Sequence, residues 1–150
     1  MLNKKDMQII TNLRQDARMN LTKMSRSTGI PVSTIFDRIK SYRNDIITKN
    51  TALIDFEKLG FNTRAKIIVK IARDDKAQFS DFIMRDFSIN SVYRINNGFD
   101  FMIEAIFHNI KEMEEFIDKI EDKFKIENIN YFYIIDDLKR ESFLTDLSLL

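Results

Sequence analysis

The segment covering residues 20–42 constrains the fold of this chain most, because a glycine, Gly29, is followed two residues later by the chain's one proline, Pro31. Gly29 tolerates the positive φ of a tight turn, and Ser25, four residues earlier, is small enough for two helices to cross there. Pro31 suits the first position of a helix, where its missing N–H is not needed. The segment therefore predicts two short helices joined at Gly29, the second beginning at Pro31.

The second of these helices has one apolar face. Ile35, Ile39 and Tyr42 recur at helical spacing and form that face. The other faces carry Val32, Ser33, Phe36, Asp37, Lys40 and Ser41. Such a pair of helices is either a DNA-binding helix-turn-helix or an ordinary pair of core helices around a glycine turn, and this segment alone leaves both open.

Charge is distributed unevenly along the chain. Residues 1–55 contain ten Lys or Arg and five Asp, a net charge of +5, whereas the remaining residues carry −4. A basic first part suits a nucleic-acid surface, because neutralising phosphates supplies most of the non-specific affinity for DNA. Scattered solvating charge would give the same count, since +5 over 55 residues is moderate.

Length and composition limit the class of protein. A chain of 150 residues with 44% apolar content can bury one core or two small ones. It has no Cys, which excludes disulfides, thiolate metal sites and cysteine nucleophiles. No apolar run approaches a membrane span, and the charged first residues do not resemble a signal peptide. We therefore expect a two-domain protein of the cytoplasm, associated with the nucleoid, without a membrane partner.

The first domain is predicted to be a winged helix-turn-helix over residues 1–55. Asn3 and Asp6 form the pattern of a helix N-cap and its partner three residues on, and open a helix. In that helix Met7, Ile10, Leu13 and Ala17 keep the helical period. Residues 46–55 are rich in β-branched side chains and follow Asn44 and Asp45, which predicts a strand or wing. A linker over about residues 55–60 would follow.

From Phe61 the pattern becomes strand, helix, strand, strand, helix, strand. Alternation marks strands near residues 65–71, 91–96, 99–107 and 127–135, and the helical period marks helices near residues 79–87 and 110–124. Asn97 and Gly98 between two β-rich runs are a strong hairpin signal. This order predicts a ferredoxin-like βαββαβ domain over residues 61–136, an antiparallel sheet with both helices on one face. The chain is thus expected to be an α+β protein.

The second face of that sheet also looks apolar. Its predicted apolar residues are Ile68, Met102, Ile106, Phe132 and Ile134. A solvated sheet face is normally polar, so sheet-to-sheet dimerisation is the best explanation. The tail over residues 137–150 adds further apolar residues, which either pack on a partner subunit or fray.

Taken together, the order of elements and several motifs resemble the Lrp/AsnC (feast/famine) family of prokaryotic transcriptional regulators. Leu2-Asn3-Lys4-Lys5-Asp6 matches the family's L-D-x-x-D, and residues 13–18 match L-x-x-D-x-R. Residues 33–39 match S-T-V-x-x-R-V, residues 54–61 match V-D-P-x-x-L-G-Y, and Gly98-Phe99-Asp100 matches the G-x-Y/F-D loop. The resemblance covers residues 2–136.

The resemblance implies partners and an effector site. Members of the family form dimers through their C-terminal sheets, assemble further into tetramers or octamers, and bind two half-sites of double-stranded operator DNA. A small effector, commonly an amino acid, is expected near the loop formed by Asn96, Asn97, Gly98, Phe99 and Asp100. The chain departs from the family at Pro31, at Asn44 or Asp45, and at residues 129–131, where the family tends to offer Thr groups to the effector. A regulator without an effector, or with a more apolar one, fits these departures as well.

The helix-turn-helix geometry assigns roles to individual residues. Early exposed side chains of the second helix lie nearest base edges, here Val32, Ser33, Thr34 and Phe36, and Phe36 can touch a thymine methyl. The predicted phosphate contacts and flanking residues are Arg38, Lys40, Ser41, Arg43, Lys23, Arg26 and Lys49. Asp37 either repels phosphate or reads a cytosine amino group. Arg38 has two equal readings, a phosphate contact or a salt bridge to Asp6 or Asp16.

An enzyme and an interaction adaptor are the alternatives. Some relatives with this architecture are siroheme decarboxylases that depend on histidines, but this chain has one, His108, for which a turn or cap role is favoured. No catalytic triad, metal-ligand spacing or phosphate-binding glycine loop is visible. We therefore expect a transcriptional regulator without enzymatic activity, catalytic residues, metal or cofactor.

Overall fold

The computed structural model describes residues 2–43 and 45–149. The chain divides into two units, of which one comprises Met1–Leu53 together with Leu138–Leu150 and the other Ile54–Asp137. Each unit has its own hydrophobic core. Asn44, at the predicted turn, and Leu150, in the predicted tail, lie outside the described residues.

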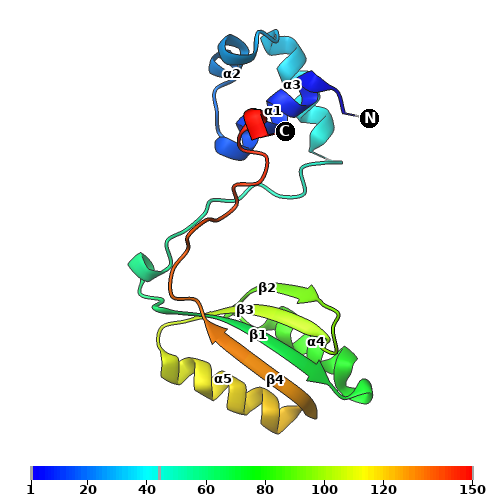
Figure 1. Cartoon of the computed structure of the whole chain (residues 1–150), viewed down its shortest axis with the longest axis vertical. Coiled ribbons are helices and arrows are strands. Elements are labelled where there is room, and N and C mark those ends of the chain that lie inside the picture. Colours follow the sequence, from blue (N-terminus) through cyan, green and yellow to red (C-terminus); the bar gives the residue numbers. More distant parts are fainter. Residues whose placement is uncertain (1, 44, 150) are drawn as a thin grey trace. The chain divides into compact units, whose positions relative to one another are not determined.

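The first unit is built on three helices, α1 (Lys4–Gln15), α2 (Leu21–Thr28) and α3 (Val32–Tyr42) (Figure 1). The predicted capping box is present, since the Asn3 side chain accepts from the Asp6 amide and the Asp6 side chain accepts from the Asn3 amide. The core of this unit consists of Ile9, Met24, Ile30, Ile35 and Tyr42. The predicted apolar face of α3 is therefore confirmed, whereas in α1 the most deeply buried apolar residue is Ile9.

The turn between α2 and α3 has the predicted chemistry. Gly29 has φ of 71° and donates its amide to the Ser25 carbonyl at 2.8 Å, which closes α2. A side chain at this φ would be strained, so glycine is required here. Pro31 differs from the prediction by one position, because its ψ of 141° is extended and makes it the N-cap of α3 rather than its first residue.

The predicted strand or wing over residues 46–55 is wrong. The described residues in this range form no strand, and the amides of Ile46 and Ile47 both donate to the carbonyl of Tyr42. A strand requires a neighbour to satisfy its backbone, and the described residues of the first unit form helices but no strand. The β-branched residues of this segment therefore have no neighbouring strand with which to pair.

The tail packs on α1 within the first unit. Arg14 donates to the carbonyls of Phe143 and Glu141, both at 3.0 Å, and its guanidinium lies 3.3 Å from the Glu141 carboxylate. Gln15 donates to the Thr145 carbonyl, and the short helix η3 (Leu147–Leu149) also contacts α1. The tail thus lies on α1 of its own chain, which neither predicted alternative included.

The second unit contains a four-stranded sheet and two α-helices. Its strands are β1 (Thr63–Ile71), β2 (Ile89–Arg94), β3 (Phe101–Phe107) and β4 (Ile126–Tyr133), and its helices are α4 (Lys76–Arg85) and α5 (Ile110–Lys123). The short helices η1 (Glu57–Leu59) and η2 (Arg73–Asp75) flank β1. The strand order is β2-β3-β1-β4, all neighbours are antiparallel, and both α-helices cover one face (Figure 1). The predicted ferredoxin-like, α+β arrangement is confirmed.

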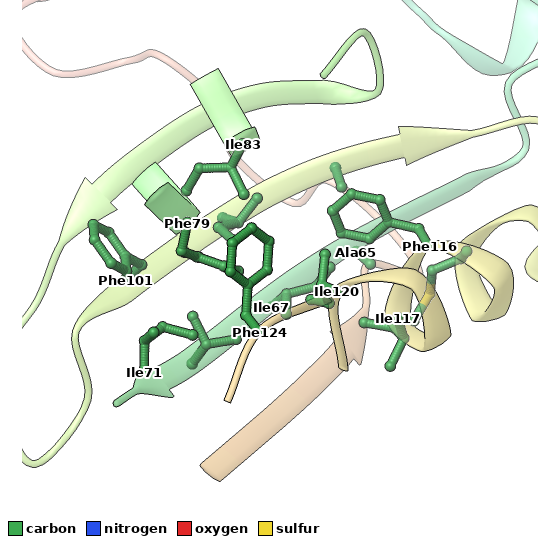
Figure 2. Packing of buried hydrophobic residues seen from close by; sticks show 14 of the residues in the cluster. Ala65, Ile67, Ile71, Phe79, Ile83, Phe101, Phe116, Ile117, Ile120 and Phe124 are labelled. Atoms are coloured by element: carbon green, nitrogen blue, oxygen red, sulfur yellow. The ribbon is translucent and has the colours of Figure 1, made fainter. Parts of the chain in front are cut away.

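The core of the second unit lies between the sheet and its two helices. Figure 2 shows Phe79 and Ile83 of α4 and Phe116, Ile117 and Ile120 of α5 directed towards the strands. The inward side chains of β1 and β3 are buried at every second residue, as the alternation predicted. Phe79 packs edge-on against Phe124, with ring centroids 5.2 Å apart. The predicted ends of the helix near residues 79–87 and of the strand near residues 127–135 are wrong, because α4 ends at Arg85 and β4 at Tyr133, and Phe87 and Ile135 beyond them are almost fully exposed.

Candidate functional site

Helix α3 is anchored to α1 by a buried carboxylate. Asp6 is only 2% exposed, and one of its oxygens accepts both the Tyr42 hydroxyl and the Arg38 guanidinium. Its other oxygen accepts the Asn3 amide at 2.8 Å. The Tyr42 hydroxyl, followed by the Asn3 amide and the Arg38 charge, holds the pKa of Asp6 below its usual value despite burial. Burial and the hydrogen bond to Asp6 raise the pKa of Tyr42 to about 12.

This arrangement contains one of the two contacts predicted for Arg38. The guanidinium pairs with Asp6, which is the salt bridge considered above, while the Arg38 side chain remains 39% exposed. Its charge is therefore already engaged inside the protein. Arg38 fixes the position of α3 relative to α1.

The exposed side of α3 carries few long polar side chains. Phe36 is 57% exposed and Val32 is 41% exposed, and Ser33, Asp37 and Lys40 are exposed beside them. Thr34 is half-buried, and the Ser41 hydroxyl donates to the Arg38 carbonyl at 2.7 Å. The side chains predicted to face DNA are thus accessible, except that Thr34 is partly covered.

Several exposed cations of the first unit have no ion-pair partner among the described residues. Lys23 and Arg26 on α2, Lys40 on α3, Arg43 at its C-cap and Lys49 beyond it are all exposed. No ion pair of these five residues is found among the described residues. Their charge is available to an anionic partner such as phosphate.

The loop between β2 and β3 is a second candidate site. It spans residues 95–100, because Arg94 pairs with Phe101 in the hairpin. Asn97 and Gly98 both have positive φ, 63° and 81°, as a tight Asn-Gly turn requires. Asn96, Asn97 and Gly98 are exposed, whereas Phe99 is half-buried.

Asp100 ties this loop to the neighbouring strand and helix. Its carboxylate accepts the Ile71 amide at 2.9 Å and lies 2.8 Å from the Lys76 ammonium, while its own amide donates to the Val69 carbonyl at 2.8 Å. Burial raises the pKa of Asp100, but the hydrogen bonds from Lys76 and Ile71 outweigh it and leave that pKa below its usual value. The loop is therefore held firmly at its base and open at its tip.

The outer face of the sheet combines apolar side chains with a buried ion pair. Glu104 is nearly buried, lies 2.8 Å from Lys66 and accepts the Asn90 amide. Lys66 also lies over the Tyr93 ring, 5.8 Å from its centroid. Of the predicted apolar residues, Phe132 is exposed, and the others, Ile68, Met102, Ile106 and Ile134, are half-buried. The face is less purely apolar than its pattern suggested.

His108 has partners within its own unit. Its ring stacks on Phe61 with centroids 4.3 Å apart, and its Nδ1 lies 3.0 Å from the Glu112 carboxylate. Its amide donates to the same carboxylate at the start of α5. Among the described residues no group of three His, Asp or Glu could hold a metal ion, and no helix could cross a membrane.

Sequence reasoning missed two participants. Tyr42 was assigned to the apolar core, but its hydroxyl also bonds to Asp6. Lys76 was not assigned to the loop at all, although it pairs with Asp100. A tyrosine in an otherwise aliphatic stripe is a usable signal, because a buried hydroxyl needs a partner. Nothing in the spacing of Lys76 and Asp100 signals their pairing.

Comparison with protein families matches both units. Residues 2–45 match the model described as winged helix-turn-helix DNA-binding. Residues 64–143 match the model described as the Lrp/AsnC ligand binding domain. The first match includes α1 to α3, and the second includes the four strands except for Thr63, the first residue of β1.

Individual relatives agree with these matches. The chain is 30% identical over 116 residues to the HTH-type transcriptional regulator FL11 of Pyrococcus furiosus, which covers 77% of each chain. The corresponding identity is 32% for FL11 of Pyrococcus horikoshii, with the same coverage.

Solved structures share the fold over most of the chain. The transcriptional regulator NMB0573 of Neisseria meningitidis, in its L-Met complex, has a TM-score of 0.86 at 19% identity and covers 93% of this chain and 94% of its own. LrpC of Bacillus subtilis has a TM-score of 0.83 at 21% identity and covers 93% of this chain and 98% of its own.

Proposed function

This chain belongs to the Lrp/AsnC family of transcriptional regulators, and on that premise we propose that it binds two operator half-sites as a homodimer. Its helix-turn-helix unit is the DNA-binding part and its sheet unit the ligand-binding part. It would act in the cytoplasm, at the nucleoid. The FL11 relatives named above are transcriptional regulators, and we propose no enzymatic activity for this chain.

The exposed, unpaired cations around α3 are the observation that carries the DNA-binding role. Lys40 and Arg43 lie on or next to the helix, and Lys23 and Arg26 lie on the helix before it. Such cations contact phosphates and set the orientation of a recognition helix. Arg38, in contrast, is engaged by Asp6 and is assigned to positioning α3.

The outer face of the sheet supports dimerisation. Ile68, Met102 and Phe132 offer apolar contact area, while the Lys66–Glu104 pair is satisfied within the chain and needs no partner. Two such faces can meet as an isologous interface, in which the same patch serves both subunits. Dimers of this kind would hold two copies of α3 for two half-sites, and would assemble further into tetramers or octamers.

The loop over residues 95–100 supports an effector site. Its base is fixed by Asp100, whereas Asn96 and Asn97 leave amide groups exposed at its tip. The Neisseria relative is described as a complex with L-Met, which favours a small amino acid as the ligand. Where the family tends to have threonines, this chain has Ile129, Asn130 and Tyr131, and Ile129 contacts the core. We therefore expect this chain to select a different amino acid from the family members that have these threonines.

The test begins with the purified full chain and random duplexes. After selection of bound duplexes, affinity is measured from low to high salt for the wild type and for Lys40→Ala with Arg43→Ala. The double variant should lower the salt slope by roughly one to two, about one for each lost phosphate contact.

The control is Lys111→Ala, which removes an exposed cation from α5 and should leave the slope unchanged. If selection enriches no duplex sequence and the affinity does not change with salt, DNA binding is contradicted and an interaction adaptor is favoured. A slope that falls equally in the control would contradict the assignment of the interface.

A further inference from the structure

The two apolar side chains on the exposed side of α3 have no role in the fold. Val32 and Phe36 are four residues apart, so they are neighbours on one helix face. Both are substantially exposed, and neither belongs to the core of the first unit. Exposed neighbouring apolar side chains on a recognition helix need a functional explanation.

The side chains that read a purine through paired hydrogen bonds are missing from the same two turns. Residues 32–37 contain no Arg, Lys, Asn or Gln, which are the side chains that read guanine or adenine through paired hydrogen bonds. Arg38 follows, but Asp6 holds its guanidinium. Lys40 lies in the last turn of α3, whereas base contacts come from the early residues of a recognition helix.

Methyl contact is the base readout that these side chains can perform. Thymine is the base with a methyl group in the major groove, and apolar side chains recognise it there. Four residues of helix separate Val32 and Phe36 by about 6 Å along the axis. Successive base pairs are about 3.4 Å apart, so the two side chains reach methyl groups within two base-pair steps.

A protein partner fits the patch less well. Two side chains cannot supply the roughly 800 Å² that a stable protein interface buries on each partner. The same unit also exposes Lys23, Arg26 and Arg43, for which the described residues form no ion pair, and these cations favour an anionic neighbour. A DNA groove between two phosphate backbones matches both properties.

We propose that Phe36 and Val32 read thymine methyl groups, so that the half-site selected by α3 is specified by A·T pairs through apolar contact rather than by hydrogen bonds to guanine. The inference rests on the proposed DNA-binding function and names the base chemistry of that site.

The experiment removes single methyl groups from the DNA. Each thymine of a selected duplex is replaced in turn by deoxyuridine, which lacks only the 5-methyl group, and affinity is measured by fluorescence anisotropy. For the wild-type chain, one or two replacements should weaken binding about fourfold each, as expected for one buried methyl group. In Phe36→Ala the same replacement should cause no further loss.

Controls separate this effect from folding and from DNA shape. Phe87→Ala removes a Phe that is 90% exposed in the other unit, and it should keep the full deoxyuridine effect. Phe36→Leu retains an apolar contact and should keep part of it, while circular dichroism checks that each variant has folded. Val32→Ala should remove the effect at a different thymine.

The outcomes are distinct. A deoxyuridine effect of equal size in the wild type and Phe36→Ala would overturn the inference, because the methyl group would then act through DNA shape. Selected half-sites specified by G·C pairs would overturn it as well. Absence of any duplex binding would refute the proposed function itself and, with it, the inference.

Discussion

Replacement of Asp6 by Ala should destabilise the first unit more than any other single exposed or buried carboxylate change in it. Asp6 accepts three hydrogen bonds, from the Asn3 amide, the Tyr42 hydroxyl and the Arg38 guanidinium. Loss of the capping contact costs about 0.5–1 kcal/mol. The buried Tyr42 hydroxyl, left without a partner, costs about 1–3 kcal/mol. Arg38 is partly exposed and turns to water, which adds on the order of 0.5 kcal/mol.

These contributions sum to about 3 kcal/mol of unfolding free energy. A unit of this size is stable by roughly 0.05–0.15 kcal/mol per residue, so the loss is a large part of its stability. The second unit contains none of these contacts and should be unaffected. The DNA-binding part of the variant should therefore unfold at a lower urea concentration than in the wild type, while the unfolding of its sheet unit is unchanged.

Hydrogen exchange in increasing urea measures the free energy of unfolding of each unit separately. Peptides from α1 and α3 report the first unit, and peptides from β1 of the same molecule serve as the internal reference. The matched control is Asp37→Ala, which removes an exposed carboxylate from α3 and should change stability by less than about 0.5 kcal/mol.

A double-mutant cycle with Tyr42→Phe sharpens the test. Tyr42→Phe alone should cost about 1 kcal/mol, because Asp6 keeps its other two donors. The two changes share one contact, so their combined cost should fall short of the sum by about 1 kcal/mol or more. A loss below about 1 kcal/mol in Asp6→Ala, or full additivity, would refute the reasoning.

Three further predictions concern pH, the loop and the tail. Because the folded-state pKa of Tyr42 is raised to about 12, its contribution to stability should be complete below pH 10 and disappear between pH 10 and 12, and this alkaline loss should be smaller in Tyr42→Phe when titrated by circular dichroism. Asp100→Asn should weaken the loop anchor by about 1–2 kcal/mol, seen as faster hydrogen exchange of the Ile71 amide, and unchanged exchange there would contradict the anchor. Arg14→Ala should free the tail, so that limited proteolysis cuts near residue 141 faster than in the wild type, whereas Lys5→Ala on the same helix should not.

The regular elements were predictable where a binary pattern acts over a whole element. The recurrence of Ala65, Ile67 and Val69 at every second residue predicted β1, because each step of two residues returns to the core face. The helical period likewise identified α5. Phe87 and Ile135 were misassigned because they continue a pattern past the residue where the element ends.

Contacts between residues far apart in the sequence were harder to predict. The sequence presented Asp6 and Arg38 as one candidate pair among others, since a carboxylate and a guanidinium match many partners. The contact of Arg14 with the tail is made to the carbonyls of Glu141 and Phe143, and a carbonyl has the same chemistry at every residue. The wing failed for a related reason, because a strand depends on a neighbour that composition does not specify.

The discontinuity of the first unit has a consequence for synthesis. Its helices α1 to α3 are translated first, but the tail that bonds to Arg14 follows only after the whole of Ile54–Asp137 has been made. At about 5–20 residues per second, that interval lasts on the order of ten seconds. On the ribosome the three helices therefore fold with the tail-binding side of α1 open to water. The DNA-binding unit gains its last contacts only after the ligand-binding unit has been translated.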